Sequence, residues 1–119
     1  MLVVDNDRDM CQVISDVFRE EGFEVNSAHK GEDALEKLKR QPYDLIISDY
    51  KLSGISGLTV LEKVKHIRPQ TQVIMISAFI DTSTKARAKE LGAYDFIDKP
   101  FNINRLVKVV KKALKRREG

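Results

Sequence analysis

The feature of this sequence that most constrains its fold is the alternation of short apolar runs with helical patterns. Each run holds two to four residues, most of them with branched side chains. Such runs are too short for helices, and their unbroken apolar character is typical of strands buried on both faces of a sheet. The runs are Leu2–Val4, Leu45–Ile47, Val73–Ile76 and Phe96–Ile97, and a weaker alternating run at residues 23–28 predicts an edge strand.

Five further segments carry apolar residues at the spacing of an amphipathic helix. In the first, the apolar stripe is Met10, Val13, Ile14, Val17 and Phe18. Glycine or proline provides a stop signal after each of the first four segments, and Asn102 stands where it can cap the last one. The segments lie at residues 10–18, 34–38, 58–64, 82–91 and 103–114.

Five strand–helix units in this order predict an α/β fold. Strand–helix–strand connections give a doubly wound, five-stranded parallel sheet with helices on both faces. The length of 119 residues fits one domain, which we expect to span residues 1–119 with a final helix and basic tail at residues 102–119.

Composition excludes several classes of protein. No apolar run approaches the roughly 20 residues that span a bilayer, so no membrane association is expected. Cys11 is the only cysteine, which rules out an internal disulfide and makes the cytoplasm the expected location. Because Cys11 lies among apolar residues of the first helical segment, we interpret it as a buried, inert thiol.

The charge is unevenly distributed along the chain. Residues 102–119 hold seven basic residues and one acidic residue, whereas the other residues hold 14 basic and 17 acidic residues. A basic helix could contact nucleic acid, but cations also suit the last turns of a helix, where the dipole is negative. No aromatic residue is interleaved with the cations to stack on bases. We therefore expect no direct nucleic-acid binding by this domain.

Polar residues follow each apolar run, at the position where a strand ends. In an open parallel sheet, the ligand site lies beyond the carboxyl ends of the strands. The residues expected to meet there are Asp5, Asn6, Asp7, Asp49, Ser77, Asp98 and Lys99. Carboxylates repel one another unless a cation joins them, and oxygen ligands of this type suit Mg²⁺. Since an aspartate can attack phosphorus, the set predicts Mg²⁺-assisted phosphoryl transfer onto a carboxylate.

Four motifs resemble the signatures of response-regulator receiver domains, the CheY-like family of two-component and phosphorelay signalling. They are Leu2-Val3-Val4-Asp5-Asn6-Asp7, Leu45-Ile46-Ile47-Ser48-Asp49, Met75-Ile76-Ser77-Ala78 and Asp98-Lys99-Pro100-Phe101. Each motif alone is weak, but four in order with five strand–helix units between them are highly specific. The resemblance implies a flavodoxin-like sheet with strand order 2-1-3-4-5.

The resemblance also implies roles for individual residues. Asp49 is expected to accept the phosphoryl group, with Lys99 and Ser77 stabilising it. Mg²⁺, or Mn²⁺ in its place, would be held by Asp5, Asn6, Asp49 and the backbone carbonyl of Lys51. The Lys99–Pro100 peptide is expected to be cis. Phe96 matches the switch aromatic residue, which turns inward when Ser77 moves toward the phosphate.

The implied partners follow from the same resemblance. A sensor histidine kinase or a histidine phosphotransfer protein would supply the phosphoryl group. Its arrival would change the face formed by the fourth helix, fifth strand and fifth helix, which acts on an output domain or protein and offers a possible homodimer contact. The domain is thus expected to be a signalling switch that assists its own phosphorylation and slow dephosphorylation, and not an enzyme. Whether it is a single-domain protein or the receiver of a larger regulator stays open.

The sequence departs from the family pattern near the metal site. Asn6 stands where the family usually has a second acid, which predicts weaker metal affinity. The loop after Asp49 has Ser53 where proline is usual, and Ser56 where aspartate is frequent, so we expect a looser loop. Asp7 is expected to act at the start of the first helix instead of binding metal.

Two residues predict the lifetime of the phosphorylated state. Lys51 lies two residues after Asp49, and Phe79 lies two residues after Ser77. In the family, these positions flank the path of the hydrolytic water. A long lysine and a bulky apolar phenylalanine should hinder that water, which predicts a long-lived aspartyl phosphate.

Two other functions stay open at this point. A degenerate receiver, acting as a protein-binding module without phosphorylation, is compatible with Asn6. The pair Asp5 and Asp7 also resembles the nucleophile motif of haloacid-dehalogenase-type phosphatases, in which Asp5 would carry the phosphoryl group, but that leaves Asp49 unexplained. His29 and His66 have no second ligand at metal spacing, and we interpret both as surface or boundary residues.

Overall fold

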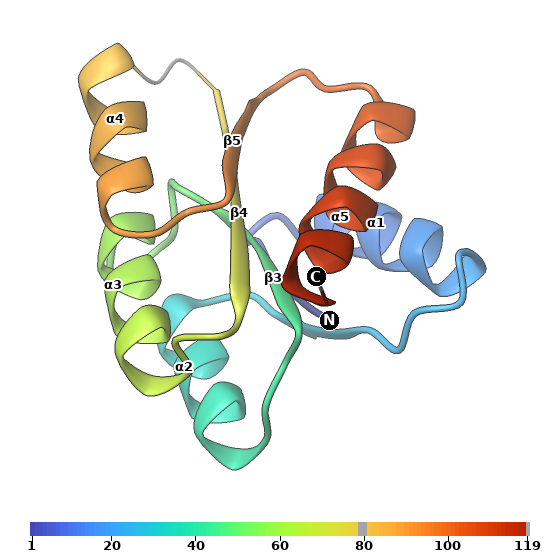
Figure 1. Cartoon of the computed structure of the whole chain (residues 1–119), viewed down its shortest axis with the longest axis horizontal. Helices are drawn as coiled ribbons and strands as arrows, with labels where there is room; N and C mark the ends of the chain where they lie inside the picture. Colours follow the sequence, from blue (N-terminus) through green and yellow to red (C-terminus); the bar gives the residue numbers. More distant parts are fainter. Residues whose placement is uncertain (79–80, 119) are drawn as a thin grey trace.

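The computed structural model of the chain describes residues 1–78 and 81–118, with side chains up to Lys115. Within these residues, five strands and five helices alternate along the chain (Figure 1). The strands are β1 (Leu2–Val4), β2 (Asn26–Ala28), β3 (Leu45–Asp49), β4 (Gln72–Ser77) and β5 (Asp95–Asp98). The helices are α1 (Arg8–Glu20), α2 (Gly31–Arg40), α3 (Gly57–Ile67), α4 (Thr82–Glu90) and α5 (Ile103–Glu118).

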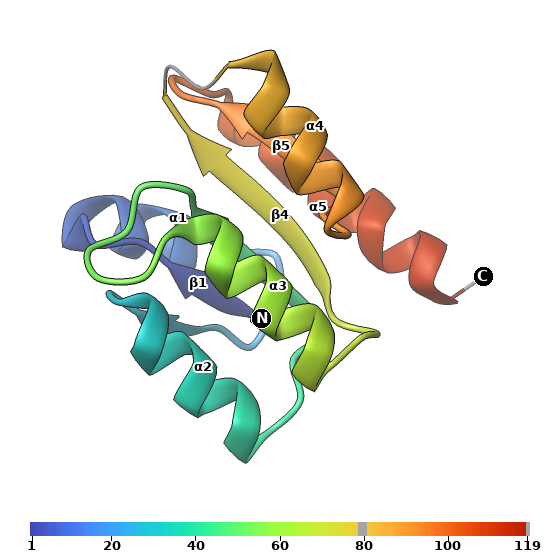
Figure 2. The ribbon, with the colours of Figure 1, turned by 90° about the vertical axis from the view of Figure 1, so that its left-hand side faces the viewer.

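The strands form one parallel sheet in the order β2-β1-β3-β4-β5, which confirms the predicted fold. Helices α2, α3 and α4 cover one face, and α1 and α5 cover the other (Figures 1 and 2). Each face has its own apolar core. On β1, Leu2 and Val4 point to the α2–α3 side, whereas Val3 points to the α1–α5 side. Burial on both faces explains why the strands appear in the sequence as unbroken apolar runs.

The edge strand β2 is shorter than the sequence pattern at residues 23–28 predicts. Its pairing is limited to the three residues of β1 beside it. The backbone N–H of Phe23 donates to the carbonyl of Phe18 at 3.0 Å, so this residue closes the end of α1. The Phe23 ring packs edge-on against Phe18 with centroids 5.7 Å apart. The apolar side chain of Phe23 thus packs at the end of α1 and not in β2. This is why the alternating sequence pattern begins before the strand does.

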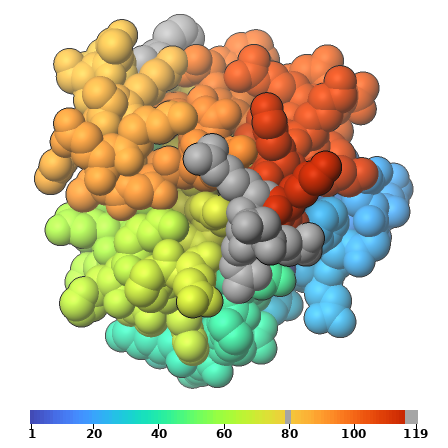
Figure 3. Space-filling model, in the orientation of Figure 1, coloured from blue at the N-terminus to red at the C-terminus, as the bar shows by residue number. Residues whose placement is uncertain are grey.

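Two predicted apolar helix positions lie at the surface. Val13 is 49% exposed, and the buried stripe of α1 consists of Cys11, Ile14, Ser15 and Phe18. In α4, Ala86 is exposed and Ala88 is the buried residue. Figure 3 shows the side chains of α4, α3 and α2 as consecutive bands of the surface. The weak apolar face of α4 leaves it with fewer core residues than the other helices.

The sheet order places the carboxyl ends of β1 and β3 side by side. The chain passes from β1 to β2 on one side and then crosses to β3 on the other. Such a switch in strand order opens a crevice beyond the strand ends, because the connections leave in opposite directions. Asp5 follows β1 directly and Asp49 ends β3, so both carboxylates lie at this crevice. Among the described residues, no helix is long and apolar enough to cross a membrane.

Candidate functional site

Asp5 and Asp49 form the centre of the site, and both are buried. Their residues are 3% and 7% exposed, respectively. The backbone N–H of Asp5 donates to the carbonyl of Ala28 at 3.1 Å, which continues the β1–β2 pairing by one residue. Its Oδ1 accepts from the backbone N–H of Asp7 at 2.9 Å. The fixed backbone therefore holds the Asp5 carboxylate at the strand end.

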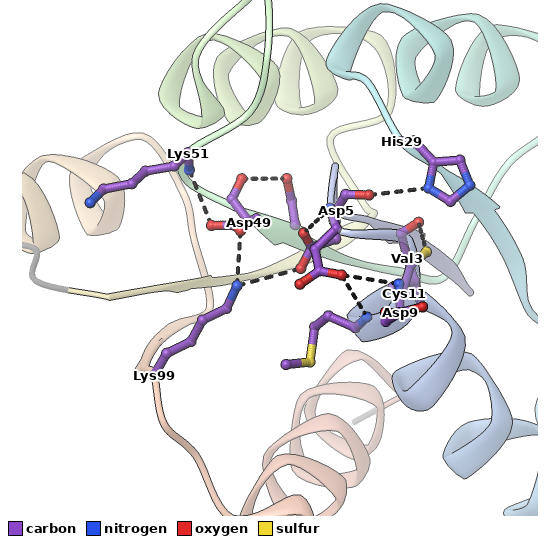
Figure 4. A network of polar contacts seen from close by, with 11 residues as sticks. Val3, Asp5, Asp9, Cys11, His29, Asp49, Lys51 and Lys99 are labelled. Atoms are coloured by element: carbon purple, nitrogen blue, oxygen red, sulfur yellow. Dashed lines mark hydrogen bonds and ion pairs between the residues drawn. The ribbon is translucent and has the colours of Figure 1, made fainter.

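Lys99 joins the two carboxylates (Figure 4). Its Nζ donates to Oδ2 of Asp49 at 3.0 Å and lies 3.5 Å from Oδ2 of Asp5. Its backbone N–H donates to the carbonyl of Ser77 at 2.8 Å, and the Lys99–Pro100 peptide is cis, as predicted. The lysine is thus held by β4 and directed across the sheet edge toward two aspartates that precede it by 94 and 50 positions.

The electrostatics of the site favour a further cation. Burial raises the pKa of Asp5, and the nearby charge of Asp49 raises it further. Burial alone would lower the pKa of Lys99, but its hydrogen bond to Asp49 and the charges of both aspartates outweigh burial and raise it. One ammonium group faces two buried carboxylates, so the unmodified site has an excess negative charge.

The loop between β3 and α3 starts directly at Asp49. The backbone N–H of Lys51 donates to Oδ1 of Asp49 at 3.1 Å, while the Lys51 ammonium group points away from Asp5 and Lys99 (Figure 4). The N–H of Tyr50 donates to Ile76 at 2.9 Å, and the N–H of Gly57 donates back to Tyr50 at 2.9 Å. Each Asp49 oxygen thus has one donor, from Lys99 or from Lys51.

The family model of the response regulator receiver domain matches residues 1–111. The chain belongs to this family.

Two curated relatives illustrate the relationship. The nitrogen assimilation regulatory protein NtrX of Azorhizobium caulinodans is 34% identical over 116 residues, which cover 96% of this chain and 26% of the relative. The response regulator protein PilR of Pseudomonas aeruginosa is also 34% identical, over 98% of this chain and 26% of the relative. The receiver domain thus spans about a quarter of the length of these relatives.

Solved receiver domains have the same fold. The receiver domain of NtrX from Brucella abortus superposes with a TM-score of 0.90 at 34% identity, and the match covers 96% of this chain and 97% of that one. The beryllofluoride-activated receiver domain dimer of NtrC4 gives a TM-score of 0.92 at 28% identity, over 98% and 96% of the two chains. The fold class predicted from the sequence is therefore confirmed by independent structures.

Receiver domains generally bind Mg²⁺, and the donor set of this receiver domain fits that ion. Within the described residues, no three histidine, cysteine, aspartate or glutamate side chains are grouped to hold a metal. The buried pair Asp5 and Asp49 offers two carboxylates, and the exposed Asn6, which follows Asp5 in the chain, would add an amide carbonyl. Mg²⁺ accepts one or two carboxylates together with neutral oxygens and several waters.

Asp7 caps a helix in this receiver domain, as predicted. Its Oδ1 accepts from the backbone N–H groups of Asp9 at 3.0 Å and Met10 at 3.2 Å. An N-cap carboxylate satisfies free N–H groups and complements the positive end of the helix dipole. The acid of the first motif that contacts Lys99 is Asp5.

Ser77 and Phe96 lie on the neighbouring strands β4 and β5. Ser77 ends β4 and is buried. Phe96, on β5, is also buried and belongs to the same core as Ala88 and Ala93, so its ring is inward in this structure. The Nζ of Lys85 lies 5.9 Å from the Phe96 ring centroid. The predicted site residue Phe79 lies outside the described residues.

Asp98 does not join the carboxylates that follow the other strands. Its Oδ2 accepts from Nζ of Lys85 on α4 at 2.7 Å, and its side chain is more than half exposed. In the sheet register, Asp49 is level with Ile76 and Ile97, and Asp98 stands one position further along β5. Because side chains alternate between the two faces along a strand, Asp98 points to the opposite face from Ile97, toward α4. The expectation that Asp98 meets Asp5 and Asp49 is wrong, whereas the expectation for Lys99 is confirmed.

Two residues near the site were missed by sequence reasoning. Nδ1 of His29 lies 3.2 Å from the backbone carbonyl of Asp5. Oε1 of Glu32 accepts from the backbone N–H of Ile55, in the β3–α3 loop, at 3.1 Å. His29 follows β2 directly and Glu32 lies in the first turn of α2, so both stand near the carboxyl end of β2, at this edge of the sheet. That position was the one available signal, since neither residue forms part of a motif.

Proposed function

We propose that Asp49 is the phosphoacceptor of this receiver domain. The observation that carries the proposal is the Lys99 ammonium group, 3.0 Å from Asp49 and 3.5 Å from Asp5. A carboxylate oxygen of Asp49 attacks the phosphorus of a phosphohistidine, the P–N bond breaks, and the imidazole leaves with its electron pair. Lys99 then pairs with the added negative charge. The Ser77 hydroxyl donates to a phosphoryl oxygen after transfer.

Asp5, Asn6, Asp49 and the backbone carbonyl of Lys51 would hold Mg²⁺, or Mn²⁺ in its place. The bound ion supplies positive charge that offsets the two carboxylates and the incoming phosphoryl oxygens. This assignment is supported by the two buried carboxylates of Asp5 and Asp49, which share the single ammonium group of Lys99 and so leave negative charge for a cation to offset. Burial and the neighbouring Asp49 raise the pKa of Asp5, in keeping with that excess charge. Since Asn6 is neutral, the domain should need more Mg²⁺ than a receiver with an acid at that position.

The proposed output runs through Phe96 and the α4–β5–α5 face. Phosphorylation draws Ser77 toward the phosphoryl group, and the inward position of Phe96 becomes favoured. The Phe96 ring already packs inward, against the same core as Ala88 of α4. Phosphorylation would therefore stabilise this ring position and the packing of α4 instead of moving the ring. Lys51 and Phe79 would slow hydrolysis of the aspartyl phosphate.

The proposed partners are a sensor histidine kinase or a histidine phosphotransfer protein upstream, and an output domain or protein downstream. We propose that residues 1–119 act in the cytoplasm as one receiver domain, a switch and not an enzyme, with a homodimer contact possible on the α4–β5–α5 face. Regulators such as NtrX and PilR carry the matching region within longer chains. The comparison leaves both a single-domain relay and a larger regulator as candidates.

Intact mass after incubation with Mg²⁺ and acetyl phosphate tests the proposal. The parent should gain one phosphoryl group, and Asp49→Asn should gain none. A gain that survives Asp49→Asn would move the nucleophile to Asp5, as in the phosphatase alternative. No gain at any Mg²⁺ concentration would favour the degenerate, phosphorylation-independent module that Asn6 allows.

A further inference from the structure

The β3–α3 loop is fixed tightly at its base. At the base, the N–H of Gly57 donates to the carbonyl of Tyr50 at 2.9 Å. A Cβ added to Gly57 would lie 2.6 Å from Cα of Tyr50, so the two ends of the loop touch through their backbones. The segment between them contains no proline and includes Gly54, and a chain of this composition loses much conformational entropy when it is ordered.

The tip of the loop is fixed from another element. Glu32, in the first turn of α2, accepts from the backbone N–H of Ile55 across 23 positions of sequence. Among the hydrogen bonds of the described residues, this is the one that ties the tip at 52–55 to the rest of the domain. A backbone N–H bonded to a carboxylate is a charge-assisted hydrogen bond and is stronger than a neutral one.

Two glycines provide the space for this contact. A Cβ on Gly31 would lie 2.7 Å from Cγ1 of Ile55, so the isoleucine packs directly over the first residue of α2. Gly54 has a φ of +85°, and a Cβ there would lie 2.7 Å from Oε1 of Glu32. The carboxylate therefore lies directly against the loop backbone at Gly54 and Ile55, although the Glu32 residue itself is exposed.

We infer that Glu32 is a positioning residue for the metal site. By holding the tip of the loop, it restricts the peptide of Lys51, whose N–H already bonds to Asp49 and whose carbonyl is the proposed ligand. This inference rests on the proposed function, because it gives Glu32 a role only if the loop contributes to Mg²⁺ binding. A loop that is ordered before the ion arrives does not lose that entropy on binding, so affinity is higher.

The test compares Glu32→Ala, Glu32→Gln and Asp33→Ala. Asp33 is the matched control, since it is an exposed acid in the same first turn of α2 and, within the part of the chain that the structure describes, forms no hydrogen bond or ion pair with the loop. Amide hydrogen exchange of Ile55 in the metal-free domain measures loop order, and calorimetric titration with Mg²⁺ measures affinity. Thermal unfolding of each variant checks that the fold is retained.

Glu32→Ala should speed exchange at Ile55 and weaken Mg²⁺ affinity by about threefold to tenfold. Glu32→Gln keeps an acceptor oxygen and should retain most of both properties, while Asp33→Ala should match the parent. The inference is overturned if Glu32→Ala binds Mg²⁺ as the parent does, or if Asp33→Ala weakens binding equally, which would indicate a general charge effect. A parent that binds no Mg²⁺ would overturn the proposed metal site as well.

Discussion

At the scale of single residues, the ionisation of Asp5 is the feature that couples the site to stability. Burial and the charge of Asp49 disfavour the ionised carboxylate, whereas the Asp7 N–H and Lys99 favour it. Because burial raises the pKa of this carboxyl group, the folded state holds its proton more tightly than the unfolded state does. The free energy of unfolding therefore falls as the pH rises from below the ordinary carboxyl pKa through the raised pKa. In the metal-free domain at neutral pH, an ionised Asp5 reduces stability.

Asp5→Asn should remove this penalty. In the absence of Mg²⁺, we expect the variant to be more stable than the parent by about 1 kcal/mol at pH 7, because no charge is buried beside Asp49. The gain should disappear below the ordinary carboxyl pKa, where Asp5 is protonated in both states. Urea denaturation at several pH values measures this, and equal stability of parent and variant at neutral pH would contradict it.

Cys11 gives a second prediction at this scale. The residue is buried, its Sγ lies 3.7 Å from the carbonyl of Val3, and burial raises the pKa of the thiol. The thiolate is the reactive form, so both burial and protonation should protect it. Ellman's reagent should label Cys11 only after denaturant is added. Rapid labelling of the folded domain would show that α1 opens locally or packs differently.

At the scale of elements, a variant of Asp7 can distinguish a helix-capping role from a metal-binding role, because Asp7 is the N-cap of α1. Asp7→Ala removes the acceptor for two N–H groups at the start of α1 and should lower the free energy of unfolding by about 1 kcal/mol. Its Mg²⁺ affinity should stay near that of the parent. Asp9→Ala, which removes an acid from the same turn without the cap, serves as the control and should lower stability by only a few tenths of a kcal/mol. Loss of Mg²⁺ binding in Asp7→Ala would instead make Asp7 a ligand.

The base of the β3–α3 loop depends on the absence of a side chain at Gly57. Gly57→Ala would place a Cβ against the backbone of Tyr50, which cannot move without shifting Asp49, and we expect a loss of about 2–3 kcal/mol. Gly22→Ala is the control, because it has a φ of +95° but nothing within 4 Å of the added Cβ. It should lose about 1 kcal/mol from backbone strain alone. Thermal unfolding compares the two, and equal losses would contradict the steric account.

At the scale of the whole molecule, the sequence predicted the sheet because its strands are buried on both faces. Unbroken runs such as Val73–Ile76 fit few other structures, and their order along the chain placed Asp5, Asp49 and Lys99 at one edge. Contacts that depend on the path of the turns could not be predicted. Asp98 turns to Lys85 because of its register in the sheet, and Glu32 reaches Ile55 because of the path of the β3–α3 loop; the sequence pattern specifies neither the register nor the path.

The family of this domain follows from its relatives, whereas the roles of Asp49, Asp5 and Lys99 are argued from the geometry of this chain. In the longer regulators NtrX and PilR, the region that matches this domain makes up 26% of the chain, so this fold also occurs as one part of larger proteins. The residue that carries the phosphoryl group is the central claim, since the metal site, the switch and the role of Glu32 all depend on it.

Reduction with borohydride tests that claim most directly. An aspartyl phosphate treated with borohydride becomes homoserine, which peptide mass spectrometry locates in the chain. After phosphorylation with acetyl phosphate and Mg²⁺, we predict homoserine at position 49 and nowhere else, and none without the phosphodonor. Homoserine at position 5, or at no position, would contradict the account.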